Sequence, residues 1–486
     1  MTFLIGGANS LADTGYDIDN SCRFDDGSSS TLEINLAESA NASRRTFTWS
    51  AWVKRGNITG AVQTLYSTGS GDDDFDSLSF DANDNLRIFC RNAGSTSATL
   101  ITNAKYRDVS AWYHIVMRID TTQGTEANRL RLYVNGEEPS LGTATYTTQN
   151  KNLLFNTTFD NSFIGCQKTN TTSLFFDGYI AEIHNVSAAS LGPGSFGETN
   201  DNGVWIPKDC KDDLTYGTNG YYLEFKGTGT SADSSGIGAD TSGNDQHFSL
   251  NNIAATDVTT DTPTNNFCTM NPLDVGSDLR DNGSFAEGNL EVTNGATSGQ
   301  ADQQRVRGTI AVTKGKWYFE MKQIANSASI GVLATEAAHG GTSANSMLVE
   351  YNDGGEIRFF NGSGRTTKTT GIDSFDDDDI VGCALDMDNR RAYFHKNGTY
   401  QGDPTPDPAG SPSGAGQFGG IQTGFTMAPC MFDNSSGSAG KGSFNFGNAP
   451  FAISSGNSDG AGFGNFEYAV PSGYFSLCTK NLATYG

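Results

Sequence analysis

Helical periodicity is almost absent from this chain. No stretch keeps apolar residues at i, i+3, i+4 and i+7 for three turns, whereas short runs rich in Val, Ile, Phe, Tyr and Trp recur between clusters of Gly, Asn, Asp and Ser. This pattern predicts an all-β protein. With 486 residues, the chain has room for two or three domains.

The charge balance excludes two classes of partner. The chain carries 31 Lys and Arg against 55 Asp and Glu, a formal net charge of −24. Such a chain repels phosphate backbones, so we expect no nucleic-acid partner. No run approaches eighteen apolar residues, so we expect no membrane partner either.

The first dense block of strands covers residues 21–189. Residues 46–54 alternate, with Phe47, Trp49 and Ala51 on one face and Trp52 displaced by a local irregularity. Asn135-Gly136 is a strong signal for a two-residue hairpin turn. So many short strands in one block predict a two-sheet, jelly-roll-like β-sandwich.

The remaining chain divides into three parts, after an N-terminal segment of residues 1–20. Residues 190–283 are sparser in strands but still contain aromatic residues, which predicts an ordered, irregular connector. Residues 284–451 predict a second sandwich. Residues 452–486 form a C-terminal tail, which we expect to dock because its aromatic residues would otherwise be exposed.

The cysteines and the N-terminus predict assembly inside a reducing cell. The eight cysteines are widely spaced, form no CxxC pair and mostly lie in apolar stretches, so we expect buried free thiols rather than disulfides. The start MTFLIGGANS lacks a basic n-region, so no signal peptide is expected.

The first block resembles laminin-G-like, concanavalin A-like jelly rolls. The motifs that carry the resemblance, in the family's order, are FTWSAWVKRG (47–56), AWYHIVMRID (111–120), RLRLYVNGE (129–137) and FFDGYIAEIHNVSAA (175–189).

The third block resembles SPRY domains. The motifs are GKWYFEM (315–321), SIGVL (329–333), DDIVGCALDMDNRRAYFHKNGTYQG (378–402), APCM (428–431) and NFGNAPF (445–451). The whole chain, with its connector and tail, is similar to marine bacteriophage virion proteins that join these two domain types.

Catalytic patterns are scarce. The five histidines lack zinc-binding spacing, and neither a nucleophile elbow nor a phosphate-binding loop occurs. Glycosidases need two carboxylates, but Glu182 and Glu320 are single acids among apolar residues. We therefore expect no enzyme, with a tail polysaccharide depolymerase as an alternative.

Calcium is the only cofactor that the sequence indicates. Hard cations take several oxygen ligands from loops, and Asp72, Asp73, Asp74 and Asp76 form a candidate set. Asp376–Asp379 form a second acidic run. Solvated acids at strand entrances are the simpler interpretation of both runs.

The SPRY resemblance implies ligand binding through loops at one end of that sandwich. The corresponding candidates here are Thr342, Asn361, Arg365 and Phe418.

The expected function is that of a non-enzymatic virion structural protein at the particle surface, assembled in the host cytoplasm. It would be a tail-fibre or tail-associated component that binds host-cell surface carbohydrate or other virion proteins. A capsid decoration or capsid-fibre protein is the alternative. The sequence leaves a homo-oligomer open.

Overall fold

The computed structural model describes residues 4–5, 15–36, 44–157, 161–295, 305–337, 339, 347–361, 365–402, 408, 418–419, 421–432 and 439–486. The chain divides into two compact units, one formed by residues 13–264 and the other by residues 1–12 with 265–486. Each unit is described by itself.

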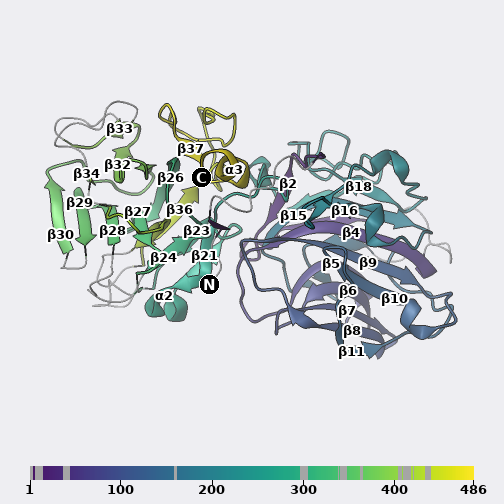
Figure 1. Ribbon diagram of the computed structural model, residues 1–486. Helices are drawn as coiled ribbons and strands as arrows, with labels where there is room; N and C mark the ends of the chain where they lie inside the picture. The colour runs from purple at the N-terminus through teal and green to yellow at the C-terminus, as the bar shows by residue number, and fades with distance from the viewer. Residues whose placement is uncertain are drawn as a thin grey trace. The chain divides into compact units, whose positions relative to one another are not determined.

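The first unit is a two-sheet sandwich (Figure 1). One sheet has seven described strands in the order β10-β9-β4-β15-β2-β20, with β18 paired to β15. These strands are Leu130–Val134 (β10), Trp112–Asp120 (β9), Thr46–Arg55 (β4), Gly178–Ser187 (β15), Ser21–Phe24 (β2), Val258–Thr259 (β20) and Tyr221–Leu223 (β18).

The second sheet of this unit has eight described strands in the order β11-β8-β7-β6-β5-β12-β3-β19. They are Leu141–Thr145 (β11), Ser95–Lys105 (β8), Asn85–Asn92 (β7), Asp74–Phe80 (β6), Gln63–Gly71 (β5), Ser162–Ile164 (β12), Thr31–Ile34 (β3) and Ser249–Asn251 (β19).

The two sheets of the first unit enclose one apolar core. Trp49 of β4 stacks on Tyr66 of β5, with ring centroids 5.8 Å apart, so side chains from both sheets meet there. Short elements complete this unit: β13 (Gln167–Lys168), β14 (Thr172–Ser173), β16 (Gly197–Thr199), β17 (Trp205–Pro207), η1 (Glu126–Asn128), η2 (Pro193–Ser195), η3 (Lys211–Asp213) and η4 (Ala255–Asp257).

Strand β4 corrects one detail of the sequence analysis. It pairs with β9 from Thr46 to Lys54 without a register shift. Trp52 is therefore not displaced by an irregularity but lies on the opposite face from Trp49 in regular alternation, 5 % exposed. The pattern looked irregular because both faces of this strand are buried.

The second unit is also a sandwich. One sheet follows the order β21-β24-β35-β27-β28-β29-β30 among the described residues. Its strands are Met270–Val275 (β21), Arg305–Gly308 (β24), Met427–Phe432 (β35), Ser329–Ala334 (β27), Met347–Asn352 (β28), Glu356–Asn361 (β29) and Arg365–Thr370 (β30).

The facing sheet follows the order β22-β23-β36-β26-β31-β32-β33, with β34 paired to β32 and β37 to β26. These strands are Ser284–Ala286 (β22), Glu291–Thr293 (β23), Lys441–Asn445 (β36), Lys316–Ala325 (β26), Ile380–Asp386 (β31), Arg391–Lys396 (β32), Thr399–Tyr400 (β33), Phe418–Gly419 (β34) and Phe475–Ser476 (β37). The other elements are β1 (Leu4–Ile5), β25 (Ile310–Ala311), α2 (Ser277–Asn282) and α3 (Thr479–Tyr485).

The architecture confirms the prediction of an all-β chain with two sandwiches. All eight cysteines are free and buried, as predicted. Among the described residues, no helix has the length and apolar character needed to cross a membrane.

Candidate functional site

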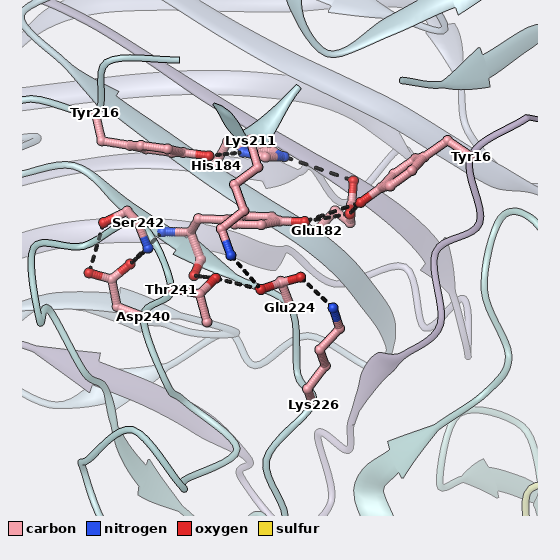
Figure 2. A network of polar contacts seen from close by, with 11 residues as sticks. Tyr16, Glu182, His184, Lys211, Tyr216, Glu224, Lys226, Asp240, Thr241 and Ser242 are labelled. Carbon is pink, nitrogen blue, oxygen red and sulfur yellow. Dashed lines mark hydrogen bonds and ion pairs between the residues drawn. The ribbon is translucent and has the colours of Figure 1, made fainter. Parts of the chain in front are cut away.

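The outer face of the seven-stranded sheet is closed by a buried polar network (Figure 2). At its centre, Glu182 lies in a bulge of β15, with a positive φ of 48°. The register of β15 against β4 shifts between Ala181 and His184. At this point β15 changes its partner from β2 to β18. The bulge therefore directs a carboxylate into a covered interior, where Glu182 is 6 % exposed.

Two tyrosines donate hydrogen bonds to one oxygen of Glu182. The Tyr222 hydroxyl lies 2.5 Å from Oε1, and Tyr16 of the N-terminal segment donates to the same atom. Burial and the Glu182 charge raise the pKa of both tyrosines above their usual value. Both therefore remain neutral donors.

Stacked rings extend the network beneath the connector. His184 stacks on Tyr222 with centroids 4.2 Å apart, and its Nδ1 lies 2.9 Å from the Tyr216 hydroxyl. On the same face, Trp205 Nε1 donates to His114 Nδ1 at 3.0 Å. Burial lowers the pKa of His114 to about 3, so this ring is neutral at physiological pH.

Charged side chains of the connector complete the closure. Glu224 accepts from Lys226 at 2.7 Å, from Lys211 at 3.2 Å and from Thr241 at 2.6 Å. Asp240 accepts from the backbone of Tyr222 at 2.8 Å. These contacts hold the segment of residues 211–241 together on the outer face of the seven-stranded sheet.

A Cys and a His also lie near Glu182, but the geometry does not activate the thiol. Cys210 Sγ lies 3.9 Å from His184 Nε2, and that same nitrogen lies 3.8 Å from Glu182 Oε2. Burial raises the pKa of Cys210 to about 12, so the sulfur stays protonated and is a poor nucleophile. The network holds the connector in place.

Glu320, the other single acid identified in the sequence, anchors the C-terminal tail. Its Oε1 accepts from the Tyr318 hydroxyl at 2.9 Å and from the Tyr468 backbone at 2.8 Å. Its Oε2 accepts from the Asn445 side chain and the Glu467 backbone, both at 3.0 Å. Four donors thus occupy both oxygens of a fully buried carboxylate.

The outer face of the eight-stranded sheet is open over β7, β8 and β11, whereas the outward side chains of β6, namely Phe75, Ser77 and Ser79, are buried. Along β7, Leu86, Ile88 and Cys90 are buried, whereas Arg87, Phe89 and Arg91 are half-exposed. In the register, Ser77 of β6 and Thr99 of β8 lie on either side of Phe89. Beyond them, Thr143 and Thr145 of the edge strand β11 are exposed.

This open face has an aromatic centre with arginines on both sides. Phe89 packs against Phe75 with centroids 5.6 Å apart, and the Arg87 guanidinium lies 5.3 Å from the Phe89 ring centre. Arg87 Nε donates to Ser79 Oγ at 3.3 Å. Sequence reasoning missed this face, although the alternation in RIFCR, residues 87–91, was its signal.

Of the four aspartates predicted to bind calcium, Asp72 and Asp73 lie at the β5–β6 turn and Asp74 and Asp76 lie in β6, and all four bind separate partners. Asp72 accepts from Asn170 at 2.7 Å, Asp73 from Arg91 at 3.0 Å and Asp74 from the Ala93 backbone at 2.7 Å. Asp76 is buried in the core and accepts from the Leu154 backbone at 2.6 Å. Their carboxylates diverge, and calcium at this turn stays a prediction.

A different acidic group converges among the described residues. The ligand atoms of Asp25, Asp26 and Asp177 lie within 4.8 Å of one another, because Phe24 and Gly178 are paired across β2 and β15. The Asn57 backbone donates to Asp177 Oδ1 at 2.9 Å. These oxygens are the donors that a hard cation takes. The repeated Phe-Asp motifs, FDDG and FFDG, were the missed signal.

The predicted SPRY-domain binding residues are only partly described. Thr342 lies outside the described residues. Asn361 ends β29, Arg365 begins β30 and Phe418 lies in β34, so these three residues are on strands. Their side chains lie outside the described part of the chain.

Comparison with known families identifies both domains. Residues 26–189 match the concanavalin A-like lectin/glucanases superfamily, in its laminin-G form. Residues 316–411 match the SPRY domain. The chain therefore contains one domain of each type. No curated protein matches it.

The solved structures that match this chain have low sequence identity to it and low TM-scores. The SPRY domain of human HERC1 is 19 % identical, with 32 % of this chain and 87 % of that chain covered and a TM-score of 0.23. A heptameric SAP-like pentraxin from Limulus polyphemus is 14 % identical, with 36 % and 79 % covered and a TM-score of 0.28. A putative carbohydrate binding protein from Bacteroides ovatus is 14 % identical, with 50 % and 60 % covered and a TM-score of 0.34. These values carry no argument about function.

Proposed function

We propose that the chain is a non-enzymatic surface protein of a bacteriophage virion, tail-fibre or tail-associated, which binds host-surface glycan through its laminin-G-like domain. The observation that carries the binding role is the contrast between the two outer faces of this sandwich. One face is closed by the connector, and the other presents Phe89 among arginine and threonine side chains. Aromatic rings beside polar groups are typical of sugar-binding surfaces.

The two single acids support a binding role over hydrolysis. Glu182 is occupied by two tyrosines, and Glu320 by four donors that include the tail backbone. Among the described residues, neither is arranged with a second carboxylate across an open cleft, as glycoside hydrolysis requires.

The virion assignment is supported by the order of the domains. A laminin-G-like domain, an irregular connector, a SPRY domain and a short tail follow one another, and this arrangement is similar to that of marine phage virion proteins. Immunogold labelling of intact particles with an antibody to this chain separates tail from capsid. Labelling on the capsid alone would favour the decoration or capsid-fibre alternative.

A glycan array probed with the whole chain tests the binding role. We expect signal on a subset of saccharides, lost in Phe89→Ala and kept in the control Tyr146→Phe, whose partly buried ring packs against the core of the same domain. An array without signal would refute glycan binding. Release of reducing ends from host polysaccharide, abolished in Glu182→Gln or Glu320→Gln, would establish the depolymerase alternative.

A further inference from the structure

The charge of the open sheet face is opposite to that of the chain. Acidic residues outnumber basic ones 55 to 31. Yet the outward positions of β6, β7, β8 and β11, all within the described residues, carry Arg87, Arg91 and Lys105 and no acid. The acids nearest Arg91 lie in the turn beyond the strand ends, where Asp73 accepts from it at 3.0 Å.

From this we infer that the open face binds an acidic polysaccharide, with saccharide carboxylates at Arg87 and Arg91 and a sugar ring on Phe89. The inference rests on the proposed function and specifies its ligand class. Guanidinium groups bind carboxylates through paired hydrogen bonds, whereas a neutral sugar makes no use of their charge.

The spacing of the two arginines favours a polymer. Arg87 and Arg91 are four residues apart on one strand, which separates them by about 13 Å along β7. A ligand that reaches both must extend along the strand, across Phe89. The β-strand holds the three side chains on a rigid element, which limits the entropy lost on binding.

The two arginines are not equivalent. Arg91 shares its charge with Asp73, and its side chain is 36 % exposed. Arg87 makes a neutral hydrogen bond to Ser79, lies beside the Phe89 ring and interacts with the charge of Asp81 without forming a direct ion pair. Arg87 is therefore the stronger carboxylate site, and its loss should weaken binding more.

Affinity electrophoresis of the full chain tests the ligand class. Native gels contain polygalacturonate, a polymer of uronic acid, or dextran, a neutral polymer. We expect retardation in polygalacturonate and none in dextran. Arg87→Gln and Arg91→Gln should each weaken retardation, with about a tenfold or greater loss of affinity for Arg87. The matched control is Arg131→Gln, which replaces a partly exposed arginine of β10 paired with Glu138, and it should behave as the wild type.

The outcomes separate this inference from the proposed function. Two results would overturn the acidic ligand and leave glycan binding intact. The first is equal retardation in both polymers that the arginine variants do not change. The second is array signal on neutral saccharides alone. An array without signal on any saccharide would overturn both. Equal melting temperatures for all variants show that each effect arises at the face and not from unfolding.

Discussion

Lys54 and Asp261 form an ion pair with Nζ and Oδ2 2.7 Å apart, and both side chains are almost fully buried. Lys54 belongs to β4, whereas Asp261 lies 207 residues later, within the connector. Trp112 Nε1 donates to the other oxygen of Asp261 at 3.3 Å. This pair fixes the connector around Asp261 to the seven-stranded sheet.

Breaking this pair should strongly destabilise the first unit. Asp261→Asn leaves a buried ammonium without its counter-charge, at a cost of about 3–5 kcal/mol. Urea unfolding followed by tryptophan fluorescence measures it, because Trp49, Trp52, Trp112 and Trp205 all lie in this unit. Asp73→Asn, which removes an exposed ion pair, is the control and should cost less than about 1 kcal/mol. A loss below 1 kcal/mol for Asp261→Asn would contradict the pairing.

The connector's cover over the outer face of the seven-stranded sheet should depend on the Tyr222 hydroxyl. Tyr222→Phe removes one donor from buried Glu182, which should cost about 1.5–3 kcal/mol. We expect faster hydrogen–deuterium exchange in residues 205–224 than in the wild type. Tyr146→Phe serves as the control. Unchanged exchange in this segment would show that the connector is held by other contacts.

Asp76 should make stability depend on pH in a specific direction. Burial raises its pKa to about 6, well above the usual 3.8. The folded state therefore binds the proton more tightly than the unfolded state. The resulting stabilisation is full below about pH 4 and is lost as the pH rises through 6.

Asp76→Asn isolates this contribution. The free energy of unfolding of the wild type, minus that of Asp76→Asn, should fall by roughly 2–3 kcal/mol between pH 4 and pH 7. Urea titrations across this range measure the difference. A difference that rises or stays constant with pH would mean that Asp76 is not buried as described.

The C-terminal tail should loosen when Glu320 is replaced. Glu320→Gln has one acceptor oxygen for four donors, so two donors lose their partner in either amide orientation. Limited proteolysis should then cut within residues 452–474 sooner. Glu356→Gln, the same change at a partly exposed ion pair with Arg358, should leave the tail protected. Equal protection in both variants would count against the anchor.

Calcium at the β5–β6 turn can be tested by the response of the melting temperature to calcium and to chelator. Because the carboxylates of Asp72 and Asp73 diverge, we expect the double variant Asp72→Asn/Asp73→Asn to respond as the wild type does. Loss of a calcium response in this variant would instead locate the ion at the predicted turn.

Local features of the fold could be predicted well from the sequence. The predicted Asn135-Gly136 turn adopts positive φ at both residues, as hairpin turns of this type require. Most of the strand motifs of both domains lie in strands, whereas NFGNAPF (445–451) lies almost entirely outside them. The open face was not identified from the sequence, because its exposure depends on the packing of neighbouring segments, and calcium at Asp72, Asp73, Asp74 and Asp76 stays a prediction.

The sequence by itself determined the strands, the turns and the two sandwich domains, because alternation and turn chemistry are local properties of the chain. Only the tertiary structure decided which face of each strand is covered. The sequence predicts an apolar strand both for residues 86–91 and for residues 179–186. The segment 86–91 presents Arg87 and Arg91 to solvent, whereas the segment 179–186 is buried on both faces. The difference arises from contacts such as Lys54 to Asp261 and Tyr16 to Glu182, which join residues too distant in sequence for any local pattern to encode.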